Sequence, residues 1–79
     1  MIDTAKLPLN HPARFRACEE ALREDDFQLL DRGLEATGDD FQDFARRAQA
    51  AGWLPEEIAA AMISLADRYV EKRLQGHGR

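Results

Sequence analysis

Two consecutive fourteen-residue segments, 25–38 and 39–52, share a pattern that constrains the fold more than any other feature of the chain. Both segments open with Asp-Asp-Phe-Gln and close with Gly, and seven of their fourteen positions match. Fourteen residues make about four turns of α-helix. Each segment starts with acids that favour a helix start and stops at a glycine that favours a helix end. The repeat therefore predicts two short helices, with Gly38 as a left-handed cap, Asp39 opening the next helix and Gly52 ending it.

The rest of the chain also favours helices, because β-branched and aromatic residues are too sparse to form a sheet. Asn10 followed by Pro12 predicts the start of the first helix. We expect an all-α fold, a compact bundle of three to four helices at about 12–24, 26–37, 40–51 and 55–75.

A change of apolar face predicts a break near residue 25. The first apolar stripe consists of Phe15, Cys18 and Leu22. The second consists of Phe27, Leu30 and Leu34. In one continuous helix the second stripe would be rotated by roughly 120° from the first. The alternative is a single long helix whose two faces pack against different neighbours.

The helix predicted at 55–75 has the widest apolar arc. Pro55 and the two acids that follow it are typical of a first helical turn. Its stripe is Ile58, Met62, Leu65, Ala66 and Tyr69, extended by Ile63, Val70 and Leu74. This arc exceeds the roughly 100° of a one-sided surface helix, so we expect a central helix that contacts two or more others. The predicted organisation is an extended arm at 1–9, a single helical domain at 10–75 and a flexible tail at 76–79.

The net charge of −4 is unevenly distributed. Residues 1–40 hold ten acids and five bases, whereas residues 41–79 hold five acids and six bases. An acidic half disfavours direct binding of nucleic acid, because phosphate contacts need clustered Lys and Arg. The acids could instead favour a basic protein partner, or simply form a solvated surface.

Cysteine usage and hydropathy indicate a compartment. A single cysteine, Cys18, excludes an internal disulfide, and no apolar run approaches the roughly 20 residues that span a bilayer. We therefore expect a cytoplasmic protein that does not bind membranes.

Few residues could carry chemistry. The adjacent carboxylates are Asp25-Asp26, Asp39-Asp40 and Glu56-Glu57. All lie at expected helix starts, where capping and the helix dipole explain them. His11 and His77 have no neighbours at metal-ligand spacing, and Cys18 lies on an apolar stripe. We expect no enzymatic activity, no metal ion and no cofactor.

Trp53 lies between Gly52 and Pro55, at a corner between two predicted helices. A tryptophan in this place usually covers the end of the core. It could instead be partly exposed as a contact anchor, because tryptophan is enriched at binding hot spots.

Two segments resemble known proteins. Residues 51–61, Ala-Gly-Trp-Leu-Pro-Glu-Glu-Ile-Ala-Ala-Ala, resemble the loop and second helix of ubiquitin-associated domains, which implies ubiquitin binding; one long helix here replaces the short pair of that family. Residues 44–69, above all Ala51-Gly52-Trp53 with Ser64-Leu65-Ala66-Asp67, look like small uncharacterised bacterial helical proteins, which implies a prokaryotic or phage setting. In size, charge and helical character the chain is also similar to phage-encoded inhibitors such as anti-CRISPR proteins.

These observations favour a small acidic helical protein that acts by binding another protein. Its sharper form is a phage or mobile-element inhibitor that blocks a basic nucleic-acid-binding partner. The residues expected to contact that partner are Asp25, Asp26, Asp39, Asp40 and Trp53. The alternative is a structural or regulatory homodimer, without enzymatic activity, joined through the helix at 55–75.

Overall fold

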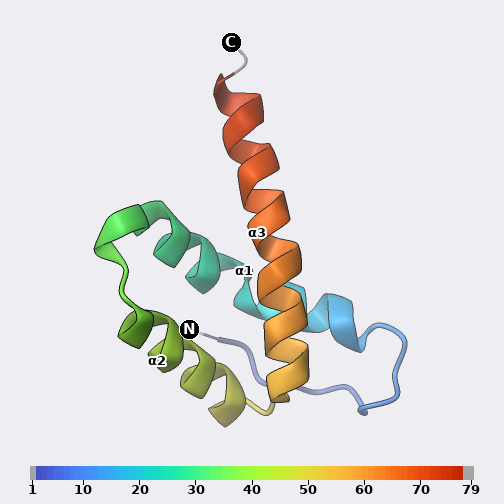
Figure 1. The fold of residues 1–79 in the computed structure, drawn as a ribbon. Coiled ribbons are helices and arrows are strands. Elements are labelled where there is room, and N and C mark those ends of the chain that lie inside the picture. The colour runs from blue at the N-terminus through green and yellow to red at the C-terminus, as the bar shows by residue number, and fades with distance from the viewer. Residues whose placement is uncertain (1, 78–79) are drawn as a thin grey trace.

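Three α-helices form the protein, which confirms the all-α prediction. The computed structural model describes residues 2–77, and these contain no strand. The helices are α1 (Arg14–Arg32), α2 (Gly38–Ala50) and α3 (Pro55–His77), with a short 3₁₀ turn at Gly33–Glu35 (Figure 1).

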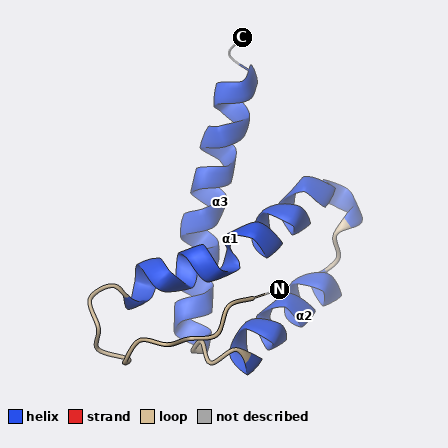
Figure 2. Ribbon diagram, turned by 180° about the vertical axis from the view of Figure 1, so that it is seen from behind, coloured by secondary structure: helices blue, strands red, loops and turns tan. Residues whose placement is uncertain are grey.

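Helices α1 and α3 cross at the centre of the molecule, and α2 packs beside both of them (Figures 1 and 2). Polar contacts join α1 to α3 in sequence order: Arg14 contacts Glu57, Glu19 contacts Ser64, and Asp31 contacts Tyr69. The two helices therefore run in the same general direction. The C-terminal part of α3 extends beyond α1 and α2, which makes the molecule elongated, with principal extents of 42 × 28 × 19 Å.

Helix α1 is continuous, so the break expected near residue 25 does not occur and the alternative of one long helix holds. Residues 14–32 contain no glycine or proline, and the first helix breaker is Gly33, whose φ is 57°. Gly33, rather than Gly38, therefore ends this helix. The helix also starts two residues later than expected, with Ala13 rather than Asn10 at its N-cap.

The second apolar stripe is covered only in part: Phe27 packs against the core and Leu30 is half-buried. The buried face of α1 continues the phase of the first stripe from Cys18 and Leu22 through Asp26 to Leu29. Leu34 is fully exposed in the 3₁₀ turn. The packing thus places an aspartate at a position where the helical period calls for an apolar side chain.

Helix α2 starts with a capping box. The Asp40 backbone N–H donates to the Thr37 hydroxyl, and the Thr37 N–H donates to the Asp40 carboxylate. The N-cap is therefore Thr37 and not Asp39, and Gly38 is the first helical residue rather than a left-handed cap. At the other end Gly52, with φ of 102°, follows the C-cap Ala51 and ends the helix as predicted.

Thr37→Ala should destabilise the protein by about 1 kcal/mol, because it removes the side-chain acceptor of the capping box. For a domain of this size the thermal midpoint should fall by about 4–8 °C. Thermal unfolding followed by circular dichroism measures the change. Thr37→Ser, which keeps the hydroxyl, should retain most of the stability; equal losses in both variants would contradict this role of the hydroxyl.

One core lies between the three helices. Its buried apolar residues are Cys18, Leu22, Leu29, Phe44, Ala48, Trp53, Ile58, Ala61 and Leu65. Residues 2–9 form an arm without regular structure that runs along the base of this core, where Ile2 and Ala5 pack against it. Residues 76 and 77, expected in a flexible tail, belong to α3, and the rest of that tail lies outside the described residues.

Candidate functional site

The five residues proposed as a partner-binding set have very different environments. Asp26 is 2% exposed and Trp53 is 3% exposed. Asp25 is half-buried and forms an ion pair with Arg47 of α2, at 3.0 Å. Asp40 pairs with Arg32 and caps α2, whereas Asp39 is exposed. The structure does not present these five side chains as one surface.

Asp26 lies inside the protein. Its Oδ2 accepts no hydrogen bond from any residue that the structure describes. Burial raises the pKa of its carboxyl from 3.8 to about 6, because the charged form loses its hydration. A basic partner therefore has no access to Asp26 in this fold.

Two of the other acids serve as helix and interhelix contacts. The hydrogen bond from the Thr37 backbone N–H, helped by the Arg32 guanidinium, holds the pKa of Asp40 below its usual value. The Asp25–Arg47 pair joins α1 to α2, and Arg47 also contacts Asp43 one turn earlier in α2. These acids stabilise the fold, so they are not available as a contact set.

Trp53 covers the end of the core, so the structure supports the first of its two expected roles. Its indole Nε1–H donates to the Asp3 carbonyl at 2.9 Å, and the Arg14 guanidinium lies 5.0 Å from the ring centre. Stacking and burial together leave little of the ring available to a partner.

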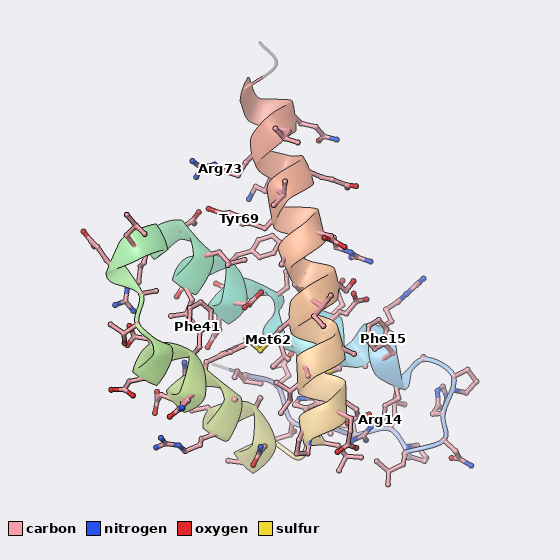
Figure 3. The ribbon with its side chains drawn as sticks, in the orientation of Figure 1. Arg14, Phe15, Phe41, Met62, Tyr69 and Arg73 are labelled. Carbon is pink, nitrogen blue, oxygen red and sulfur yellow. The ribbon has the colours of Figure 1, made fainter. Side chains whose placement is uncertain are left out.

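Arg14 was not singled out by the sequence pattern, yet it forms the most connected polar site of the protein (Figure 3). Its guanidinium makes two hydrogen bonds to Glu57, at 2.6 and 3.0 Å, and also donates to the Leu7 and Gly52 carbonyls. The side chain is almost fully buried. The bond from Arg14 lowers the pKa of Glu57, which also accepts the Leu54 N–H at the start of α3. Arg14 therefore joins the arm, α1 and the start of α3.

The upper contact between α1 and α3 is aromatic and charged. Tyr69 reaches from α3 towards α1, with Arg73 one turn further along (Figure 3), and its ring packs edge-on against Phe27 at 5.4 Å. Its hydroxyl bonds Asp31, which raises the pKa of Tyr69. The Lys72 ammonium lies over the Phe27 ring, 5.6 Å from its centre. These side chains contact one another across the interface, so this region holds α1 and α3 together.

Three exposed aliphatic side chains lie on one side of α3. Ile63, Val70 and Leu74 are 70%, 54% and 65% exposed, although the sequence pattern placed them in an extension of the buried stripe. The buried face of α3 instead contains Ile58, Ala61 and Leu65, on the opposite side of the helix. Sequence periodicity detects that α3 is apolar on two sides, but it cannot tell which side the chain itself covers.

The surroundings of Cys18 disfavour a reactive thiol. Cys18 is buried, with a pKa raised to about 11 mainly by burial, so its thiol stays protonated near neutral pH. Among the side chains that the structure describes, no three from His, Cys, Asp or Glu are grouped so that they could hold a metal ion. No helix in the described part of the chain combines the length and apolar character needed to cross a membrane.

Comparison with protein-family models, with curated proteins and with solved structures finds no match.

Proposed function

We propose that this chain is a non-enzymatic protein-interaction protein that binds its partner through the outer face of α3. The observation that carries the proposal is the exposure of Ile63, Val70 and Leu74 on one side of that helix. These residues are separated by seven and four positions, the spacing at which helices pack side by side. A helix that is apolar on two opposite sides is typical of one covered on both.

The charges beside this face favour a basic partner. On a helical wheel Glu56, Asp67 and Glu71 lie along one edge of the exposed row. A partner helix with its own apolar row and flanking Lys or Arg would cover the aliphatic side chains and neutralise the acids. This chemistry retains the basic partner expected from the sequence, but it moves the contact from the α1 and α2 acids to α3.

The sharper form of the proposal is an inhibitor, of phage or mobile-element origin, that occupies the basic surface of a nucleic-acid-binding protein. The acids beside the exposed row of α3 and the exposed side chain of Asp39 support it. Charge competition of this kind weakens with added salt, because screening reduces the attraction between exposed charges.

The second candidate is a homodimer joined through the same face. The same aliphatic row favours it, since two copies could bury six large side chains against each other. Each such side chain contributes about 1.5–3 kcal/mol when fully buried, against an association cost of about 4–15 kcal/mol. A weak dimer that forms at high protein concentration is therefore the form to test.

A labelled model helix tests the proposal directly. The probe is an amphipathic peptide with leucine at the a and d positions and lysine at the flanking positions, titrated into the protein and followed by fluorescence anisotropy. Replacing both Ile63 and Val70 by Asp should weaken binding at least about tenfold, which corresponds to 1.4 kcal/mol. Both side chains are mostly exposed, so the fold should remain intact.

Leu34→Asp provides the control, because Leu34 is a fully exposed aliphatic residue away from α3. This variant should bind the peptide as the unmodified protein does. Equal weakening by Leu34→Asp, or no peptide binding at all, would rule out α3 as the contact face. If the unmodified protein is instead dimeric by light scattering and the α3 variant is monomeric, the homodimer replaces the first proposal.

A further inference from the structure

The N-terminal arm is held through its main chain at alternate residues. The carbonyls of Asp3 and Leu7 accept from Trp53 Nε1 and Arg14 Nη1, and between them the Ala5 N–H donates to the Ala51 carbonyl at 2.8 Å. In an extended chain, alternate residues point the same way. The base of the protein is therefore a groove that binds an extended segment by its backbone.

One side chain sets what the groove accepts. The Ala5 methyl lies against Gly52, where an added Cβ would come within 3.3 Å of it. A large residue at the position of Ala5 would not fit between the arm and this turn. The groove therefore takes an extended segment with a small central residue, such as the arm itself.

The arm does not pack closely against α1 along its whole length. Between the arm and α1 lies a cavity of about 330 Å³, lined by Ala17, Glu20 and Ala21 on the α1 side. The arm is thus attached by its main-chain anchors and a few side chains, and it lies outside the three helices (Figure 2).

The connection from the arm to α1 is an exposed hinge. All residues from Pro8 to Ala13 are exposed, and the chain reverses there through the His11 N–H to Pro8 carbonyl bond and the Arg14 N–H to His11 carbonyl bond. Opening these local turns would release the arm towards another molecule.

From these contacts we infer that the groove also accepts the arm of a second copy of this chain, so that two molecules can exchange arms. In each groove Trp53 and Arg14 would donate to the neighbour's arm, the Ala51 carbonyl would accept from it, and Trp53 would stay covered. The exchanged dimer reuses an interface that already exists, which is the low-cost route to a dimer known as domain swapping. The inference is independent of the contact face proposed on α3.

Shortening the hinge tests the inference. Deleting Leu9, Asn10 and His11 removes the reversal, and a strained short hinge favours exchange over closure. The measured mass should be twice that of one shortened chain, as read by light scattering after gel filtration. Trp53 fluorescence should remain that of a buried indole. A monomer in which a soluble quencher reaches Trp53 would overturn the inference.

Two further variants separate the causes of dimerisation. Adding Ala5→Glu to the shortened hinge should abolish the dimer and expose Trp53, because the groove has no room beside Gly52. Replacing Ile63 and Val70 by Asp in the shortened-hinge protein should leave the dimer intact. A dimer that survives Ala5→Glu, or one that is lost when Ile63 and Val70 are replaced, would also overturn arm exchange. Neither result would decide whether α3 binds another partner.

A trapping experiment covers the case in which the shortened hinge prevents folding. In the otherwise unmodified chain, Ala5→Cys together with Ala51→Cys should form a disulfide within one molecule or between two, because the Ala5 N–H bonds the Ala51 carbonyl. The protein is refolded under reducing conditions and oxidised afterwards, when Cys18 is buried. After refolding at rising concentration, the proportion of disulfide-linked dimer on non-reducing gels should increase. Linked monomer alone at every concentration would refute the exchange.

Discussion

Arg14→Met should lower the thermal midpoint by about 10 °C or more, the largest loss that we expect from a single side chain in this protein. The substitution keeps an apolar stem of similar length, so the loss reports the guanidinium. Three acceptors lose their donor at once: the Glu57 carboxylate and the carbonyls of Leu7 and Gly52. These bonds are partly buried, and an acceptor left unpaired there costs more than the bond itself contributes. Thermal unfolding by circular dichroism measures the effect.

Two controls separate charge from geometry at this site. Arg14→Lys keeps the charge but cannot reach Glu57 with two parallel bonds, so it should recover only part of the stability. Glu57→Gln keeps an acceptor near Arg14 and should cost less than Arg14→Met, because both carbonyl contacts remain. If Arg14→Lys is as stable as the unmodified protein, the bidentate contact is not what stabilises this corner.

Lowering the pH should narrow the difference in stability between the unmodified protein and Arg14→Met. Arg14 lowers the pKa of Glu57 below its ordinary 4.5 in the folded state. The stabilisation is therefore present above pH 4.5 and is lost as the pH falls through the lowered value of the folded protein. Arg14→Met lacks this contact, so its stability should fall less steeply with acid than that of the unmodified protein.

The helices could be predicted from the sequence because their signals are local. Proline at the start of α3, the absence of glycine and proline from 56 to 75 and the glycine after α2 all act within a few residues. The boundaries of α1 were missed for the same reason. Its apolar pattern changes at residue 25, but a helix without glycine or proline continues when neighbouring helices cover both of its faces, as Tyr69 of α3 covers Phe27.

The repeat shows the limit of such signals. Residues 25–28 and 39–42 are the same tetrapeptide, yet the first lies in the middle of α1 and the second near the start of α2. The difference comes from the preceding residues: Thr37 supplies a cap before the second copy, whereas the first follows an unbroken helix. Local similarity therefore predicted helix correctly but assigned capping to acids that have other roles.

The candidate site could not be predicted from the sequence, because it depends on which helix faces are buried by the rest of the protein. Asp26 and Trp53 differ from exposed residues only in what packs over them. The role of Arg14 had a weak signal, since it lies four residues before Cys18 on the same side of the helix. A basic residue on a buried helical face requires an acceptor elsewhere, and only the fold shows that Glu57 provides it.

Asp26→Leu should stabilise the protein at pH 7 by about 1–3 kcal/mol, the opposite of what a core substitution usually does. Asp26 is 2% exposed, in the buried row of α1 that includes Leu22 and Leu29, and its Oδ2 accepts no bond from the described residues. A buried carboxylate without a partner loses its hydration and gains nothing in return. Urea unfolding at pH 7 measures the gain.

The pH dependence identifies the cause. Burial raises the pKa of Asp26 from 3.8 to about 6, so below pH 3.8 its carboxyl is protonated in both the folded and the unfolded chain. As the pH rises from 3.8 to 6 the unfolded chain ionises first, and folding loses stability; above pH 6 the loss is complete. Asp26→Asn, which cannot ionise, should lack this loss, so its stability relative to the unmodified protein should rise between pH 4 and pH 7. Parallel stability curves for the two proteins over that range would show that the Asp26 carboxylate is compensated inside the fold.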